Sequence, residues 1–127
     1  MPLVAKIILT PFSILMRIIN LSKKCVLAVE VILANSFLER AKGLLGYNSL
    51  GTNQAMILRP SNSVHTFFMR FAIDVLFVGK DNIVIAAVTN MRPFRATGIF
   101  LKSAFVIELP AGIIKSTGTS KGDLLQI

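Results

Sequence analysis

Four polar side chains that could do chemistry fall close together in one apolar stretch. The stretch SNSVHTFFMRFAIDVLFVGKDN holds the chain's single histidine, His65, followed within ten residues by Thr66, Arg70 and Asp74. In a regular strand, alternate side chains share a face, so His65 would lie among apolar neighbours. Such a histidine is either a hydrogen-bonded core or rim residue or a general base. A general base also needs a reactive partner, which the sequence does not place.

Two carboxylates stand alone in apolar segments, Asp74 in FAIDVLFV and Glu108 in FVIELPAG. An unpaired buried charge is costly, so each carboxylate is expected to have a partner or a water-lined opening. The candidate partners are Arg40, Arg59 and Arg70. Two alternatives follow: the carboxylates form stabilising ion pairs, or a carboxylate and an arginine face each other across a pocket, where their protonation would be perturbed.

Established catalytic and cofactor motifs are absent from the sequence, which holds no nucleophile elbow, phosphate loop, dinucleotide fingerprint or zinc-protease motif. A triad of Ser63, His65 and Asp74 can be drawn, but spacing along one strand would not give Ser63 and His65 an attack geometry. With one histidine and the single cysteine Cys25, we expect no metal site, no cofactor and no intrachain disulfide.

The chain has 127 residues, which predicts a single domain, and 54% of them are hydrophobic against 16% charged. Such a composition indicates either a membrane segment or strands buried on both faces. The best apolar run, residues 7–16, has ten residues with Thr, Pro and Ser among them, whereas a spanning helix needs about 20. We therefore expect no transmembrane span.

The first fifteen residues are expected to be a peripheral N-terminal extension, and residues 16–127 a single β-rich domain. One alternative is a secretory signal, although no small-residue cleavage site follows the apolar run. Another is that the start of the chain has been assigned too far upstream. A cytoplasmic location is favoured, with export or membrane association as the alternative.

The net charge of +8 would attract polyanions or a small anionic ligand. The positive charges are dispersed, because Lys23 and Lys24 form the only adjacent pair. Dispersion argues for a solvated surface and against a nucleic-acid interface, so weak polyanion binding is the less favoured alternative.

Periodicity predicts one helix among many strands. Ser36 and Glu39 form a capping-box pattern, and residues 37–45 place apolar side chains on one face before Gly46, which would end the helix. Strands are expected at residues 25–33, 54–59, 63–69, 74–78, 82–89, 103–109 and 123–127. The fold class is therefore mainly β: a jelly-roll-like sandwich or partly closed barrel, with one short amphipathic helix covering an open end.

Three ordered motifs resemble the uncharacterised bacterial and archaeal family called Domain of Unknown Function 192. They are FLERAKGLLG, AMILRPSNSVHTFFMRFAIDVLFV and VIELPAGIIKSTGTSKGDLLQI, and the likeness runs from about Met16 to Ile127. Phenylalanine at position 68 and leucine at position 45 replace the tryptophan and methionine of the family pattern. The resemblance implies a small, mainly β, jelly-roll-like fold with one helix, and no established reaction, cofactor or ligand.

The leading functional hypothesis is a non-enzymatic module that binds an unknown small or anionic ligand. The alternative is an enzyme that uses Asp74 or Glu108 as general acid or base and an arginine to stabilise negative charge. The candidate ligand-binding residues are Arg40, Met56, His65, Phe68, Met69, Arg70, Asp74 and Glu108.

Overall fold

A computed structural model of the protein describes residues 8–10 and 13–127. Strands form most of its regular structure, and two short helices accompany them. In chain order the elements are β1 (Ile8–Thr10), β2 (Ser13–Asn20), β3 (Cys25–Ala34), α1 (Phe37–Lys42), β4 (Gln54–Leu58), β5 (Ile73–Val78), β6 (Val84–Met91), β7 (Phe105–Pro110), α2 (Ile113–Thr117) and β8 (Leu125–Gln126).

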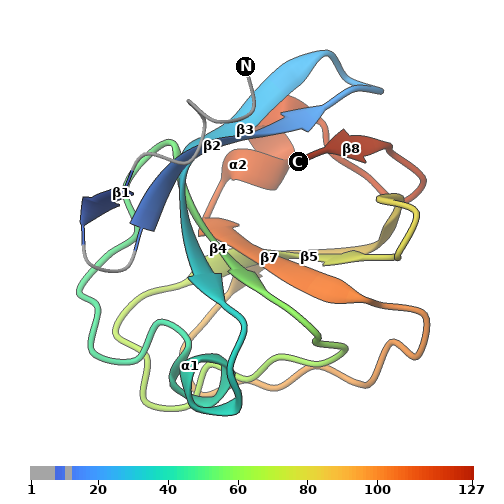
Figure 1. Ribbon diagram of the computed structural model, residues 1–127. Helices are drawn as coiled ribbons and strands as arrows, with labels where there is room; N and C mark the ends of the chain where they lie inside the picture. The colour runs from blue at the N-terminus through green and yellow to red at the C-terminus, as the bar shows by residue number, and fades with distance from the viewer. Residues whose placement is uncertain (1–7, 11–12) are drawn as a thin grey trace.

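The strands form one curled sheet in the order β1-β2-β3-β4-β7-β5-β6, with β8 paired to β2. The β3–β4 pair is parallel, and the other neighbouring pairs are antiparallel. A bridge between Ile83 and Leu124 joins the start of β6 to the segment that leads into β8. The sheet therefore curls into a half-barrel, as Figure 1 shows, which confirms the prediction of a mainly β, partly closed barrel.

The central strands are buried on both faces, and every residue of β5 is buried. One face packs against α2 and β8 through residues such as Ile114 and Leu125. The opposite face packs against long loops, which contribute Leu44, Val64 and Met69. This double burial accounts for the apolar composition, because strands covered on both sides need apolar residues at nearly every position.

The capping box predicted for α1 is confirmed, since Ser36 Oγ accepts from Glu39 N and the Glu39 side chain accepts from Ser36 N. Three hydrogen bonds to the Glu39 carboxylate, first among them the one from the Ser36 backbone, hold its pKa below the ordinary value. The helix is shorter than expected because Gly43, at φ +50°, ends it. The expected buried face is wrong: Phe37 and Leu38 are exposed.

The strand predicted at residues 63–69 is wrong. The segment is a loop that makes one isolated bridge, His65 to Ala96, and Phe68 has φ +64°, which a strand does not allow. Its backbone bonds to the loop after β6 instead: Thr66 N donates to Arg95 O at 2.8 Å. The alternation of faces is lost as a result, so Thr66 is buried while His65 and Phe68 are exposed.

Three features of the structure lie outside the sequence expectations. Helix α2 was not expected, and both β1 and the first residues of β2, from Ser13, lie inside the segment expected to be an extension. The rest of that segment, residues 1–7 and 11–12, lies outside the described residues. Neither helix in the described part of the chain has the length and apolar character needed to cross a bilayer.

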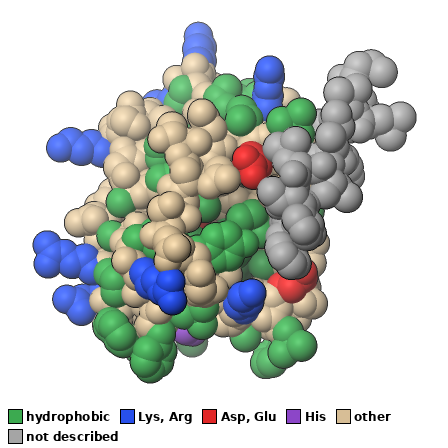
Figure 2. Space-filling model, turned by 90° about the vertical axis from the view of Figure 1, so that its left-hand side faces the viewer, with side chains coloured by type: hydrophobic (Ala, Val, Ile, Leu, Met, Phe, Trp, Pro, Cys, Tyr) green, Lys and Arg blue, Asp and Glu red, His purple; other side chains and the backbone are tan. Residues whose placement is uncertain are grey.

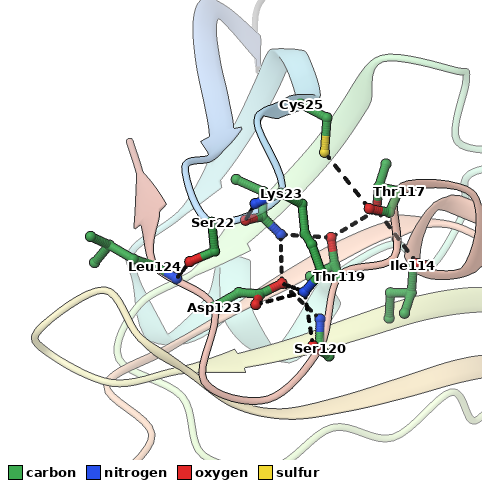
Figure 3. Close-up of polar contacts among 10 residues, drawn as sticks. Ser22, Lys23, Cys25, Ile114, Thr117, Thr119, Ser120, Asp123 and Leu124 are labelled. Atoms are coloured by element: carbon green, nitrogen blue, oxygen red, sulfur yellow. Dashed lines mark hydrogen bonds and ion pairs between the residues drawn. The ribbon is translucent and has the colours of Figure 1, made fainter.

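A polar network attaches the C-terminal segment to the turn between β2 and β3 (Figure 3). Asn20 Nδ2 donates to Asp123 Oδ2 at 2.9 Å and to Thr119 Oγ1 at 3.0 Å, and Lys23 forms an ion pair with Asp123. Burial alone would raise the pKa of Asp123, but the hydrogen bonds from Asn20, Lys23 and Ser120 together lower it. The network therefore helps to hold β8 beside β2, which keeps the sheet curled.

Candidate functional site

Glu108 lies on β7, an inner strand between β4 and β5, and its side chain is on the loop-covered face. The register places it between Met56 of β4 and Val75 of β5. Both neighbours are buried and apolar, and Glu108 itself is only 3% exposed. Its carboxyl group is thus surrounded by apolar side chains at the level of the sheet.

A cavity of about 270 Å³ lies above this carboxyl group. Gly43 forms part of its wall so closely that a Cβ at this position would lie 3.9 Å from Glu108 Oε1. Gly43 also has φ +50°, so the backbone of any larger residue at this position would be strained, and its side chain would extend toward the carboxyl group. The cavity is lined by Phe37, Arg40, Ala41, Lys42, Gly43, Leu44, Leu45, Leu58, Ser61, Ser63, Val64, His65, Phe67, Met69 and Glu108.

The carboxyl group of Glu108 is incompletely satisfied. Its Oε1 atom is buried and has no hydrogen-bond partner among the described residues. Burial raises the pKa of Glu108 to about 8, because removal from water disfavours the charged form. At neutral pH the side chain is therefore mostly a carboxylic acid, which can donate one hydrogen bond and accept others.

Basic and aromatic side chains form the rim of the cavity. The His65 ring stacks on the Phe67 ring with centroids 5.1 Å apart, and His65 Nδ1 accepts from Phe67 N. Arg40 donates to the backbone oxygens of Asn35 and Arg59, which fixes its guanidinium beside α1. A ligand that entered the cavity would pass positive charge at the rim before it reached the carboxylic acid.

Asp74 lies on the opposite face of the sheet and holds backbone groups. Its carboxylate accepts from Asn90 N at 2.8 Å, Gly112 N at 3.0 Å and Ile114 N at 2.8 Å. These donors belong to the end of β6 and the start of α2, so one side chain fixes both. The expectation that arginine neutralises the two carboxylates is therefore wrong. Asp74 is surrounded by backbone amides, whereas Glu108 Oε1 has no hydrogen-bond partner among the described residues.

The three expected arginine partners make other contacts. Arg40 binds backbone oxygens, the Arg59 guanidinium lies 4.0 Å from the centroid of the Phe105 ring, and Arg70 donates to Asn48 Oδ1. In the described part of the chain, none of these three arginines therefore pairs with Asp74.

The structure brings together four of the eight candidate residues, Arg40, His65, Met69 and Glu108, as lining of one cavity. The other four lie elsewhere. Met56 is buried beside Glu108, and Asp74 is on the opposite face of the sheet. Phe68 is exposed and contacts Phe94, and Arg70 is at the surface. Within the described residues there is no group of three acidic, histidine or cysteine side chains suited to a metal ion.

Sequence reasoning missed Gly43, Ser61 and Ser63 as lining residues. Gly43 belongs to the RAKGLL motif and was placed inside the helix expected at residues 37–45, with Gly46 as the glycine that ends it. In the structure Gly43 itself ends α1 and lies in the wall of the cavity, beside the Glu108 carboxyl group. Ser63 was considered only as a member of a triad on a strand, and Ser61 carried no signal, since serine is common in loops.

The exposed position of His65 gives a stability prediction. We expect His65→Ala to change the free energy of unfolding by no more than about 0.5 kcal/mol, because surface substitutions away from the core have small effects. Urea unfolding monitored by circular dichroism measures the change. A loss of several kcal/mol would show instead that the stacked His65–Phe67 pair holds the loop of residues 61–70 in place.

Comparisons with known proteins agree with this architecture and add no activity. The model of the DUF192 family, described as "Uncharacterized ACR", matches residues 18–127. A UPF0127 protein of Pyrococcus horikoshii is 33% identical over 113 residues, covering 86% of this chain and 96% of the relative. A UPF0127 protein of Pyrococcus abyssi is 34% identical over 113 residues, covering 86% and 95%.

Solved structures share the fold. A crystal structure of a protein of unknown function from Novosphingobium aromaticivorans superposes with a TM-score of 0.77 at 21% identity, covering 90% of this chain and 86% of that one. A second one, from Sinorhizobium meliloti, of a protein proposed to be a transcription regulator, has a TM-score of 0.73 at 25% identity, covering 87% and 89%. The half-barrel is thus an architecture already seen in crystals.

Proposed function

Since the chain belongs to the DUF192 family, whose description supplies no activity, we propose a function from the cavity itself: the protein binds a small anionic organic molecule above Glu108. The observation that carries the proposal is the buried Oε1 atom of Glu108, which faces a cavity and has no partner among the described residues. A buried polar atom without a partner is costly, and a ligand that supplied the missing hydrogen bond would recover that free energy.

The lining residues define the chemistry of such a ligand. The walls are mostly apolar, which suits a compact carbon skeleton, and the neutral acid of Glu108 suits a hydroxyl, carbonyl or amide group. Arg40 and Lys42 lie at the mouth and suit a carboxylate or phosphate ester that remains near solvent. The favoured ligand therefore has an anionic group at one end and a neutral polar group at the other.

Native mass spectrometry of the purified protein, followed by a thermal-shift screen of small anionic metabolites, tests this proposal. We expect at least one compound to raise the melting temperature of the wild type. Glu108→Gln, which keeps a donor and an acceptor, should retain the shift, whereas Glu108→Leu should lose it. The absence of a bound species and of any stabilising compound across a broad library would overturn the proposal.

A blocking variant shows whether the ligand occupies this cavity. Ser63 is exposed and lines the cavity, so the large ring of Ser63→Trp should obstruct the cavity without disturbing the core. The matched control is Ser116→Trp, on the exposed side of α2, which lies away from α1 in Figure 1. We expect the thermal shift to disappear in the first variant only; equal shifts in both would place the ligand elsewhere.

A second candidate function is general acid catalysis by Glu108, favoured by its pKa of about 8. A carboxylic acid that stays protonated at neutral pH can donate a proton to a leaving group. The two functions differ in one measurement. If mass spectrometry shows that wild-type protein converts the bound compound and Glu108→Gln binds it unchanged, the protein is an enzyme; if neither converts it, the binding function stands.

A further inference from the structure

Exposed apolar and basic side chains gather at the end of the molecule that carries α1 and the loops of residues 61–70 and 91–102. We call this the aromatic–basic surface. Figure 2 shows hydrophobic side chains along the lower end of the molecule on either side of the histidine, with Lys and Arg side chains above them. Its members are Phe37, Leu38, Phe67, Phe68, Phe94, Ile99 and Leu101, with Arg70, Arg92, Arg95 and Lys102.

The apolar members are far more exposed than such side chains usually are in a folded protein. Phe68 is 75% exposed, Leu38 78% and Leu101 86%. Clustered exposure of large apolar side chains marks an interaction surface, whereas isolated exposed leucines need no explanation. The exposure of several such residues on adjoining segments therefore points to a partner.

Contacts between the segments show that the surface is continuous. The rings of Phe68 and Phe94 meet edge to face with centroids 5.3 Å apart. Phe94 N donates to Thr66 O at 3.0 Å, and Phe100 N donates to Asn62 O at 2.8 Å, so the two loops lie side by side. Phe37 of α1 and Phe67 line the same cavity, which joins the helix to the loops.

The charges on the two loops of this surface have one sign. Residues 61–70 and 91–102 contain four Lys and Arg and no Asp or Glu. The nearby acid Glu39 is occupied by the capping box, where it accepts from Asn35 N and Ser36 N. A second copy of this chain would bring like charges together, so the complementary partner is negatively charged.

Lipid and nucleic acid both offer negative charge, and the apolar residues distinguish them. Nucleic-acid surfaces use aromatic rings that stack on bases, whereas Leu38, Ile99 and Leu101 are aliphatic and have no base to stack on. Aliphatic and aromatic residues surrounded by Lys and Arg are typical of segments that lie in the interface of an anionic bilayer. We propose that the aromatic–basic surface binds an anionic membrane, with Phe68 and Phe94 inserted among the headgroups and the arginines contacting phosphate.

Vesicle flotation with the full chain tests this proposal. We expect binding to vesicles of phosphatidylcholine mixed with phosphatidylserine, weak binding to phosphatidylcholine alone, and a decrease as salt rises. Phe68 and Phe94 have φ of +64° and +62°, a region that asparagine tolerates well. Phe68→Asn with Phe94→Asn should therefore fold normally and weaken binding at least about tenfold, since two inserted rings are lost.

Charge variants separate this surface from the overall charge of the protein. Arg92→Gln with Arg95→Gln should weaken binding at least about tenfold, because each charge near an anionic bilayer contributes about fivefold. The matched control is Lys80→Gln with Lys121→Gln, two exposed lysines outside the surface, which should leave binding nearly unchanged. Equal losses in both pairs would overturn the proposal in favour of diffuse attraction.

Two further outcomes would also overturn it. Binding to single-stranded oligonucleotides without binding to vesicles would assign the surface to nucleic acid. A dimer of the wild type that Phe68→Asn with Phe94→Asn converts to a monomer, seen by size-exclusion chromatography with light scattering, would assign it to self-association. A monomer that floats with anionic vesicles and loses flotation in both surface variants supports the membrane.

Discussion

Replacing Asp74 by asparagine is expected to lower the free energy of unfolding by about 3 kcal/mol or more. The Asp74 carboxylate, which is fully buried, accepts hydrogen bonds from Asn90 N, Gly112 N and Ile114 N. The amide nitrogen of asparagine cannot accept, so at least one buried backbone N–H would lose its partner and face another donor. Hydrogen bonds to charged groups contribute about 1.5–3 kcal/mol each, and an orphaned donor adds its desolvation cost.

Asp81→Asn is the matched control for this substitution. Asp81 lies in the exposed turn between β5 and β6, and its Oδ1 atom accepts from one backbone amide, that of Ile83. Asparagine keeps an oxygen for that single donor, so the change should be within about 0.5 kcal/mol. Urea titrations of both variants measure the difference; an unfolding free energy of Asp74→Asn close to that of Asp81→Asn would show that the turn before α2 needs no charged acceptor.

Asp74 also shows how far a sequence can predict a site. An aspartate inside an apolar strand requires a partner, and that requirement was visible in the sequence. The identity of the partner was not visible, because nearly every residue has a backbone amide, whatever its type, and the sequence does not mark which amides will donate. Asp74 therefore looked like half of an ion pair, whereas it supports the turn made by the PAG of VIELPAG.

The strands that were predicted correctly share a strong local signal. They are runs of apolar residues bounded by turn residues or Pro: residues 25–33, 54–59, 74–78, 82–89 and 103–109, which correspond to β3, β4, β5, β6 and β7. Residues 63–69 carry similar composition, but the segment pairs with a distant loop and bends at Phe68. Tertiary contacts of that kind lie far away in the sequence, so local alternation cannot reveal them.

Only part of the candidate site could be predicted from local sequence signals. His65 and Glu108 were identified as polar or charged residues in apolar segments, and Arg40 as a possible partner of the carboxylates; the structure brings all three to one cavity. Phe68 and Arg70 were included on the assumption of a regular strand, and they point elsewhere once the segment becomes a loop. Whether the cavity residues bind a ligand stays a prediction.

The stability of the protein is expected to fall as pH rises between about 4.5 and 8, and Glu108 is the cause. Burial raises the pKa of Glu108 from 4.5 to about 8 in the folded state, while the unfolded chain releases the proton near 4.5. Over this interval the folded state binds more protons than the unfolded state, so each pH unit removes about 1.4 kcal/mol of stability. The total loss is roughly 5 kcal/mol, complete above pH 8.

Glu108→Gln isolates this effect, because glutamine resembles the protonated acid and does not ionise. Below about pH 4.5 the two proteins should unfold at similar urea concentrations, since both carry a neutral side chain at this position. At pH 7 the variant should be more stable by about 3 kcal/mol and above pH 8 by roughly 5 kcal/mol. The other titrating groups are common to both proteins and cancel in the difference. Urea titrations at a series of pH values measure it, and parallel curves from pH 4 to 9 would show that Glu108 ionises in the folded protein as it does in water, through contact with solvent in the cavity.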